Sequence, residues 1–232
     1  LTSIVITSIA LAQSGTPEVL RTILTLEIVI QVVEFVWYAT VGALYVTLGW
    51  NIEIAMRYID WIWTTPLMLV SLMFFSIFDA DRCVANSDLL GDGSRVVALI
   101  CLIVFDWQML VVGAAYELKG SNLADWFAGM LDSISPGFSG LWLGFVPLVA
   151  AFVPLFVIAG EGASKTAWGI VSVSLTFVLW TLYGMVALFV NDVETKNTSY
   201  NLLDIVSKNV VGIIIASVAL SNDFSTVVCP TA

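Results

Sequence analysis

The chain has 232 residues, of which 59% are hydrophobic and 11% are charged. A soluble domain carries about 25% charged residues, so this composition excludes an ordinary soluble domain and indicates a chain solvated mostly by lipid. The net charge of −10 and the scattering of the eight Lys and Arg residues exclude a nucleic-acid-binding protein.

Seven segments are long and apolar enough to cross a membrane as helices, which takes about 20 residues each. In chain order they are 1–21, 23–46, 51–78, 94–117, 137–159, 163–190 and 197–220. The first contains Ser14, Gly15 and Pro17, which predict a kinked or truncated helix.

The longest polar connections are 79–93 and 118–136, and the second includes a short amphipathic stretch around Leu123–Leu131. The other connections are short, which favours antiparallel neighbours in one bundle. We therefore expect an all-α fold, a seven-transmembrane-helix bundle over 1–220 with a polar tail over 221–232. The chain begins with Leu rather than Met, so we expect residues to precede it. The first apolar run follows no basic segment, so we expect no signal peptide.

The cysteines Cys83, Cys101 and Cys229 have neither paired nor metal-binding spacing, and we predict all three to be unpaired. The chain has no histidine, so we expect no metal site.

Loop Lys and Arg residues predict the orientation in the membrane, because they favour the cytoplasmic side. With the N-terminus outside, the cytoplasmic loops hold Arg21, Arg82, Arg95 and Lys165, and the outer loops hold Lys119 and Lys196. We expect an integral multi-pass protein with its N-terminus outside and its C-terminus cytoplasmic.

The two remaining basic residues, Arg57 and Lys208, fall in the interior of predicted spans rather than at their ends. A central charge costs at least about 2.5–3.5 kcal/mol, so each needs a partner. Asp204 precedes Lys208 by one helical turn. One interpretation of Lys208 is a structural buried ion pair. The other is a Schiff-base lysine, because a buried amine readily loses its proton and attacks an aldehyde.

The third predicted helix places Arg57, Asp60 and Thr64 on one face. Asp60 lies about as deep in its helix as Lys208 does in the seventh, at about 1.5 Å per residue. With Asp204, these side chains would form a nearly neutral buried cluster, which a protonated Schiff base requires. A carboxylate beside that cation is also its natural proton acceptor.

The sequence RYIDWIWTTP at 57–66, together with DIVSK at 204–208, resembles the microbial (type 1) rhodopsin family. The resemblance implies a membrane protein that transports ions in response to light, rather than an enzyme. It also implies all-trans-retinal covalently bound to Lys208, with Asp60 and Asp204 as counterions and Arg57 as a gate.

The same resemblance implies a retinal pocket. Its lining would be Trp61, Thr64, Thr65, Met68, Met109, Gly113, Trp180 and Tyr183, with Trp142 on a looser alignment, and Asp106 would hydrogen-bond Thr65. Without Lys208, the aromatic residues would be read as ordinary helix packing. The chain departs from the family where Gly184 replaces a frequent proline. The apolar Met68 suggests green absorption.

Proton pumps of this family carry a carboxylate eleven residues after the acceptor, where this chain has Ser71. The signature Asp60, Thr64, Ser71 resembles the DTS-motif viral rhodopsins of giant viruses. The second predicted helix carries Glu27 and Glu34 on one face.

Counted from a turn near residue 49, Glu27 and Ser71 are equally far, and Glu34 is level with Thr64. We therefore expect Glu27 to lie beside Ser71 and to supply the missing carboxyl. Alternatively, both glutamates stay protonated and hydrogen-bond across helices.

The favoured function is an outward proton pump, in which Asp60 accepts a proton and Glu27, or water by way of Ser71, restores it. Glu194 or Asp192 would then release protons outside. The alternative is a light-gated cation channel lined by Glu27 and Glu34, and a photosensor is a third interpretation. The expected partners are the lipid bilayer and protons or small cations, and the sequence is compatible with a homo-oligomer.

Overall fold

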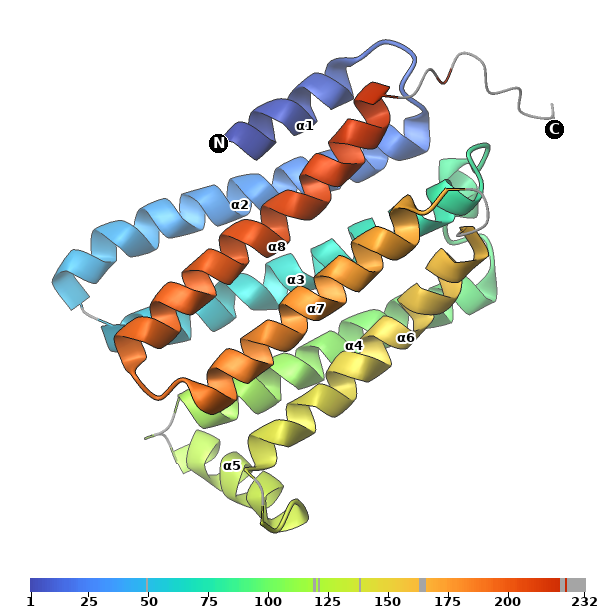
Figure 1. Ribbon diagram of the computed structural model, residues 1–232. Helices are drawn as coiled ribbons and strands as arrows, with labels where there is room; N and C mark the ends of the chain where they lie inside the picture. Colours follow the sequence, from blue (N-terminus) through green and yellow to red (C-terminus); the bar gives the residue numbers. More distant parts are fainter. Residues whose placement is uncertain are drawn as a thin grey trace.

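A computed structural model describes residues 1–48, 50–118, 120, 122–137, 139–162, 166–221 and 224, with the backbone alone over 41–55. The described part contains eight α-helices, two 3-10 helices and no strand. The α-helices are α1 (Thr2–Ala12), α2 (Glu18–Leu48), α3 (Trp50–Ala80), α4 (Gly93–Glu117), α5 (Asn122–Ile134), α6 (Phe145–Gly162), α7 (Trp168–Phe189) and α8 (Val193–Ser221) (Figure 1). The 3-10 helices are Asn86–Asp88 and Gly140–Gly144.

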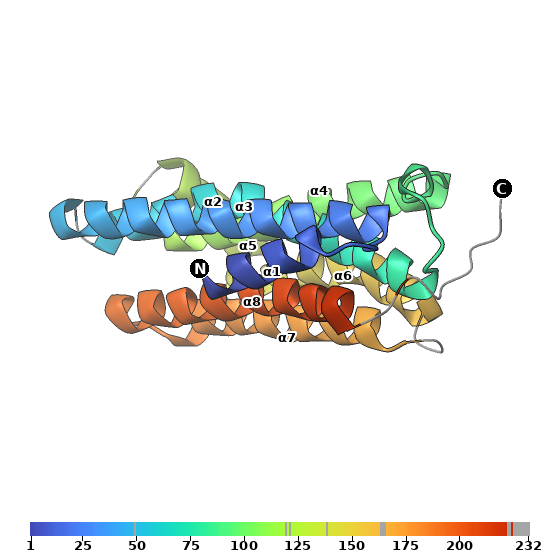
Figure 2. The same ribbon diagram turned by 90° about the horizontal axis from the view of Figure 1, so that it is seen from above.

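All helices except α5 form one bundle. Each packs on the next along the chain, α4 packs on α6, and α8 returns to α1. Helix α3 also contacts α6, α7 and α8, so it occupies the interior. Figure 2 shows two layers, with α2 in one and with α7 and α8 in the other. We call the two ends of the bundle the Ala80 end, where α3 finishes and α7 begins, and the Glu117 end, where α4 finishes and α8 begins.

Five helical stretches of the described residues are long and apolar enough to cross a membrane. They are Met56–Ala80, Gly93–Glu117, Gly140–Gly162, Trp168–Phe189 and Val193–Ser221. Helix α1 has only 11 residues, and α2 carries the buried ionisable side chains of Glu27 and Glu34 along its apolar length.

The predicted first helix over 1–21 is wrong at its end, because the chain turns after Ala12. Gly15 adopts a φ of +86°, which residues with a side chain rarely do, and Pro17 stands directly before α2. The amphipathic stretch predicted near Leu123–Leu131 is confirmed as α5. The span predicted to start at 137 starts instead as a 3-10 helix and becomes α6 at Phe145.

Two aspartates fix the starts of long helices. Asp92 accepts a hydrogen bond from the backbone N–H of Ser94 at 3.1 Å and caps α4. The hydrogen bonds from Ser94 lower the pKa of Asp92, so the charged cap persists to lower pH than for an ordinary aspartate. Asp192 accepts from the backbone N–H of Thr195 at 2.8 Å at the start of α8, which likewise lowers its pKa.

Pro66 interrupts the hydrogen bonding inside α3, because proline has no N–H to donate to the carbonyl one turn earlier. That carbonyl, of Ile62, accepts a hydrogen bond from Trp107 Nε1 of α4 at 3.1 Å. The proline is therefore accommodated, and α3 continues past it towards Ser71.

The prediction of unpaired cysteines is wrong for Cys83, which is disulfide-bonded, whereas Cys101 is free as predicted. Spacing along the chain cannot show which residues folding brings together, and this is why the pairing escaped the sequence. Three residues that entered the predictions of orientation and cysteine pairing lie outside the described residues, namely Lys119, Lys165 and Cys229. The tail over 222–232 also lies outside them, apart from Phe224.

Candidate retinal-binding and ion-transport site

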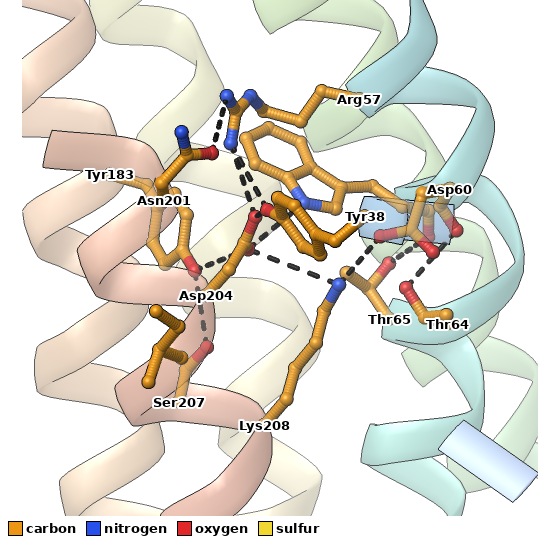
Figure 3. A network of polar contacts seen from close by, with 12 residues as sticks. Tyr38, Arg57, Asp60, Thr64, Thr65, Tyr183, Asn201, Asp204, Ser207 and Lys208 are labelled. Atoms are coloured by element: carbon orange, nitrogen blue, oxygen red, sulfur yellow. Dashed lines mark hydrogen bonds and ion pairs between the residues drawn. The ribbon is translucent and has the colours of Figure 1, made fainter. Parts of the chain in front are cut away.

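Lys208 of α8 and Asp60 of α3 form a buried ion pair at the centre of the bundle (Figure 3). Lys208 Nζ lies 2.6 Å from Asp60 Oδ2 and 4.0 Å from Asp204 Oδ1, and both side chains of the shorter pair are 1% exposed. The expectation that these residues share one depth is confirmed. The nearer carboxylate, Asp60, is placed to accept a proton from the Lys208 nitrogen.

Asp204 is held by four side chains from three other helices. Arg57 Nη1 lies 3.2 Å from Asp204 Oδ2, and Trp61 Nε1 donates to Oδ1 at 3.1 Å. The Tyr183 hydroxyl donates to Oδ1 at 2.6 Å, and Tyr38 donates to Oδ2. Hydrogen bonds of this number hold the Asp204 carboxylate in one position.

Arg57 has a second set of contacts on the side towards the Glu117 end. Its Nη2 donates to Asn201 Oδ1 at 3.0 Å, and its guanidinium carbon lies 5.3 Å from the centre of the Tyr200 ring. Two cations and two carboxylates are thus brought together, which compensates their burial.

A second polar cluster lies on α2, nearer the Ala80 end. Ser71 Oγ donates to Glu27 Oε1 at 2.5 Å, so the predicted proximity of these two residues is confirmed. Gln31 and Glu34 follow on the same face, and Glu27, Gln31 and Glu34 are 2%, 2% and 6% exposed. Glu34 lies one helical turn before Tyr38, which is hydrogen-bonded to Asp204, so α2 joins this cluster to the central one.

A cavity opens from Lys208 between α3, α4, α6 and α7. Of the predicted pocket residues, those that line it are Trp61, Thr65, Met68, Met109, Gly113, Trp180, Tyr183 and Lys208. Thr64 is not among the lining residues, since it is fully buried and donates to the backbone oxygen of Asp60 at 3.0 Å.

Two further predicted pocket residues lie behind the cavity wall. Trp142 is 40% exposed and packs against Phe145 with the two rings tilted, and Phe145 lines the cavity in its place. Asp106 lies behind Thr65, whose hydroxyl donates to Asp106 Oδ2 at 2.7 Å, as the resemblance implied.

The lining fits a long apolar molecule that ends in an aldehyde at Lys208. Two of its glycines let side chains of the cavity wall pack closely on the helix backbone, because a Cβ on Gly113 would lie 2.7 Å from the Tyr58 hydroxyl and one on Gly184 would lie 2.5 Å from Phe145 Cζ. Retinal has this shape and this chemistry.

The Glu117 end holds a carboxylate that sequence reasoning missed. Glu117 accepts hydrogen bonds from the hydroxyls of Tyr58 at 2.9 Å and Tyr200 at 2.6 Å. Asp192 and Glu194, the residues expected to release protons, are exposed at the same end of the bundle. Glu117 escaped notice because a carboxylate at the last position of a span is normally solvated.

The family model for bacteriorhodopsin-like proteins matches residues 2–222. No curated protein sequence matches the chain. Among solved structures, viral rhodopsin OLPVRII superimposes with a TM-score of 0.74 at 23% identity, over 94% of this chain and 91% of that one. A thermophilic rhodopsin gives 0.67 at 16% identity, over 94% and 89%. Halorhodopsin, described as a light-driven chloride pump, gives 0.63 at 20% identity, over 94% and 92%.

These similarities confirm the seven-helix bundle, with α5 as an addition to it. They also identify the apolar helices as those of an integral multi-pass membrane protein. The chain belongs to the bacteriorhodopsin-like family, the microbial rhodopsins.

Proposed function

We propose that the protein binds all-trans-retinal through Lys208 and is a light-driven outward proton pump. The observation that carries this proposal is the buried contact of 2.6 Å between Lys208 Nζ and Asp60 Oδ2, at the end of an aromatic-lined cavity. Bound retinal supplies light absorption and a change of shape on illumination.

The side chains around Lys208 supply the proton path. Asp60 accepts the proton of the Lys208 nitrogen, since its carboxylate is the nearest base. Loss of the Asp60 charge weakens the electrostatic attraction between Arg57 and the cluster around Lys208. The other partners of Arg57 lie towards the Glu117 end. Glu27, which is hydrogen-bonded to Ser71, restores the proton from the Ala80 side. With the N-terminus outside, this sequence moves protons outward.

A light-gated cation channel is the second candidate, because the row of buried polar side chains on α2 extends past the level of Lys208. Tyr38 is bonded to Asp204, and Glu34, Gln31 and Glu27 continue from it towards the Ala80 end. Both polar atoms of the Gln31 side chain and Oε1 of Glu34 have no hydrogen-bond partner among the described residues.

Buried polar atoms of this kind are normally hydrogen-bonded to water. A continuous row of water molecules along Tyr38, Glu34, Gln31 and Glu27, which we call the α2 water path, would bypass the Lys208 nitrogen and conduct ions. A pump needs this path interrupted at Lys208, whereas a channel needs it continuous.

Photocurrent measured against voltage, in membranes supplied with retinal, separates the two candidates. A pump gives current of one sign at all voltages, and we expect this result. A current that reverses at the equilibrium potential of a cation would establish the channel instead. Absence of current in a protein that shows a visible band would contradict both and favour a sensor.

A further inference from the structure

Glu117 is a buried carboxylate that the proposed proton path does not use. Its side chain is 4% exposed although it ends α4. It accepts one hydrogen bond from Tyr58 of α3 and another from Tyr200 of α8, on different oxygens. Lys196 Nζ lies 3.6 Å from Glu117 Oε1, and the Lys196 side chain is 18% exposed, so Lys196 covers the carboxylate on the side of the solution.

The bond to Tyr200 crosses the bundle. Among the described residues, α4 and α8 do not pack on each other, so the Tyr200 side chain spans the space between them. Tyr58 and Tyr200 both line the retinal cavity. Trp61 packs edge-on against both rings, at centroid distances of 5.3 and 5.7 Å. We call Tyr58, Trp61 and Tyr200 the aromatic floor of the cavity.

We propose that Glu117 is a positioning residue that holds the aromatic floor closed between the retinal cavity and the solution at the Glu117 end. This inference rests on the proposed binding of retinal to Lys208. Two tyrosine hydroxyls in an apolar wall each need an acceptor, and one carboxylate serves both. The aromatic floor also contacts Arg57, because the Tyr200 ring faces the Arg57 guanidinium.

The test is the rate at which hydroxylamine bleaches the visible band in the dark, which reports access of a small solute to the Lys208 linkage. We expect Glu117→Leu to bleach about tenfold faster than the wild type, because two buried hydrogen bonds are lost. Glu117→Gln should lie between the two, since an amide oxygen can still accept from one tyrosine. Asp125→Asn, which changes an exposed carboxylate at the same end, should bleach at the wild-type rate.

Tyr200→Phe keeps the ring and removes one hydroxyl, so it tests the floor even if Glu117→Leu folds poorly. The combination of Glu117→Gln and Tyr200→Phe should be less than additive, because both remove one bond. A structural role elsewhere would give additive effects. In the retinal-free protein, Glu117→Gln should also speed amide hydrogen exchange in the first turns of α8.

Bleaching of Glu117→Gln and Tyr200→Phe at the wild-type rate would overturn the inference while leaving retinal binding intact. A wild-type protein that forms no visible band with retinal would overturn the proposed function, and this inference with it.

Discussion

At the scale of single residues, the two carboxylates near Lys208 have different surroundings. Asp204 receives hydrogen bonds from Arg57, Trp61 and two tyrosines, whereas Lys208 is the only described side chain that donates to Asp60, whose Oδ1 has no partner among the described residues. Both oxygens of Asp204 are thus occupied by donors, whereas Asp60 has an oxygen free to receive a proton. This difference supports our proposal of Asp60 as the acceptor and Asp204 as a fixed counterion.

Asp60→Asn should therefore keep the shape of the site and remove the acceptor. Neutralising a charge beside the cationic nitrogen should shift the visible band to longer wavelength, and light-driven proton transport should fall by about 10²–10⁴-fold, as for loss of a general base. Flash spectroscopy and photocurrents of the same sample measure both effects. Transport at the wild-type rate would refute the assignment.

Gly212 of α8 lies against the polar side chains of α2. A Cβ there would meet Gln31 and would lie 3.0 Å from Glu27 Oε2. We expect Gly212→Ala to displace these side chains and to cost about 1–3 kcal/mol of stability. In a pump the substitution should slow the return of the proton to the Lys208 nitrogen, and in a channel it should reduce the current. Gly160→Ala is the matched control, because nothing lies within 4 Å of its Cβ. Equal photocycle rates for the two variants would show that neither protons nor cations move along the polar side chains of α2.

The chemistry of these residues was largely predictable from the sequence, because charges inside apolar spans are few and each needs a partner. The shared depth of Lys208 and Asp60 followed from counting along two helices that run in the same direction. The proximity of Glu27 and Ser71 followed from counting outward from the turn between two antiparallel helices. Glu117 did not follow, since its burial depends on tyrosines contributed by two other helices.

At the scale of helices, α7 begins without a capping side chain of its own, because its N-cap residue is Ala167. The cap comes from α3, where Asp79 Oδ2 accepts from the backbone N–H of Gly169 at 2.8 Å. Asp79 also accepts from Arg82 at 2.6 Å and from Thr166. One buried carboxylate thus ties the end of α3 to the start of α7 and closes the Ala80 end.

Asp79→Asn should loosen this closure, because the charged acceptor shared by Arg82 and the α7 backbone is lost. The loss of a cap costs about 0.5–2 kcal/mol, and the loss of the partly buried pair with Arg82 adds to it. We expect faster amide hydrogen exchange over 167–172 with the visible band unchanged. Unchanged exchange there would show that the contact does not hold α7.

Element boundaries were the least predictable feature at this scale. The spans over 94–117 and 197–220 match α4 and α8 closely, since apolar length marks them. The break after α1 depends on the backbone of Gly15, and the 3-10 start before α6 depends on packing against α4, neither of which hydropathy reports.

At the scale of the whole molecule, the direction of transport depends on the orientation of the bundle. The loop charges favour a cytoplasmic Ala80 end, and in that proposed orientation the polar cluster of Glu27 and Ser71 would face inside and Glu117 outside. A fluorescent label attached after residue 232 should be quenched by an impermeant quencher only after the cells are permeabilised. Quenching in intact cells would reverse the orientation, and with it the predicted direction of pumping.

The whole account depends on Lys208 as the attachment point of retinal. Addition of all-trans-retinal to the retinal-free protein should produce a visible band that hydroxylamine bleaches. Lys208→Ala should produce none, whereas Lys165→Ala should produce the wild-type band. A bleachable band in Lys208→Ala, or no band in the wild type, would contradict the account.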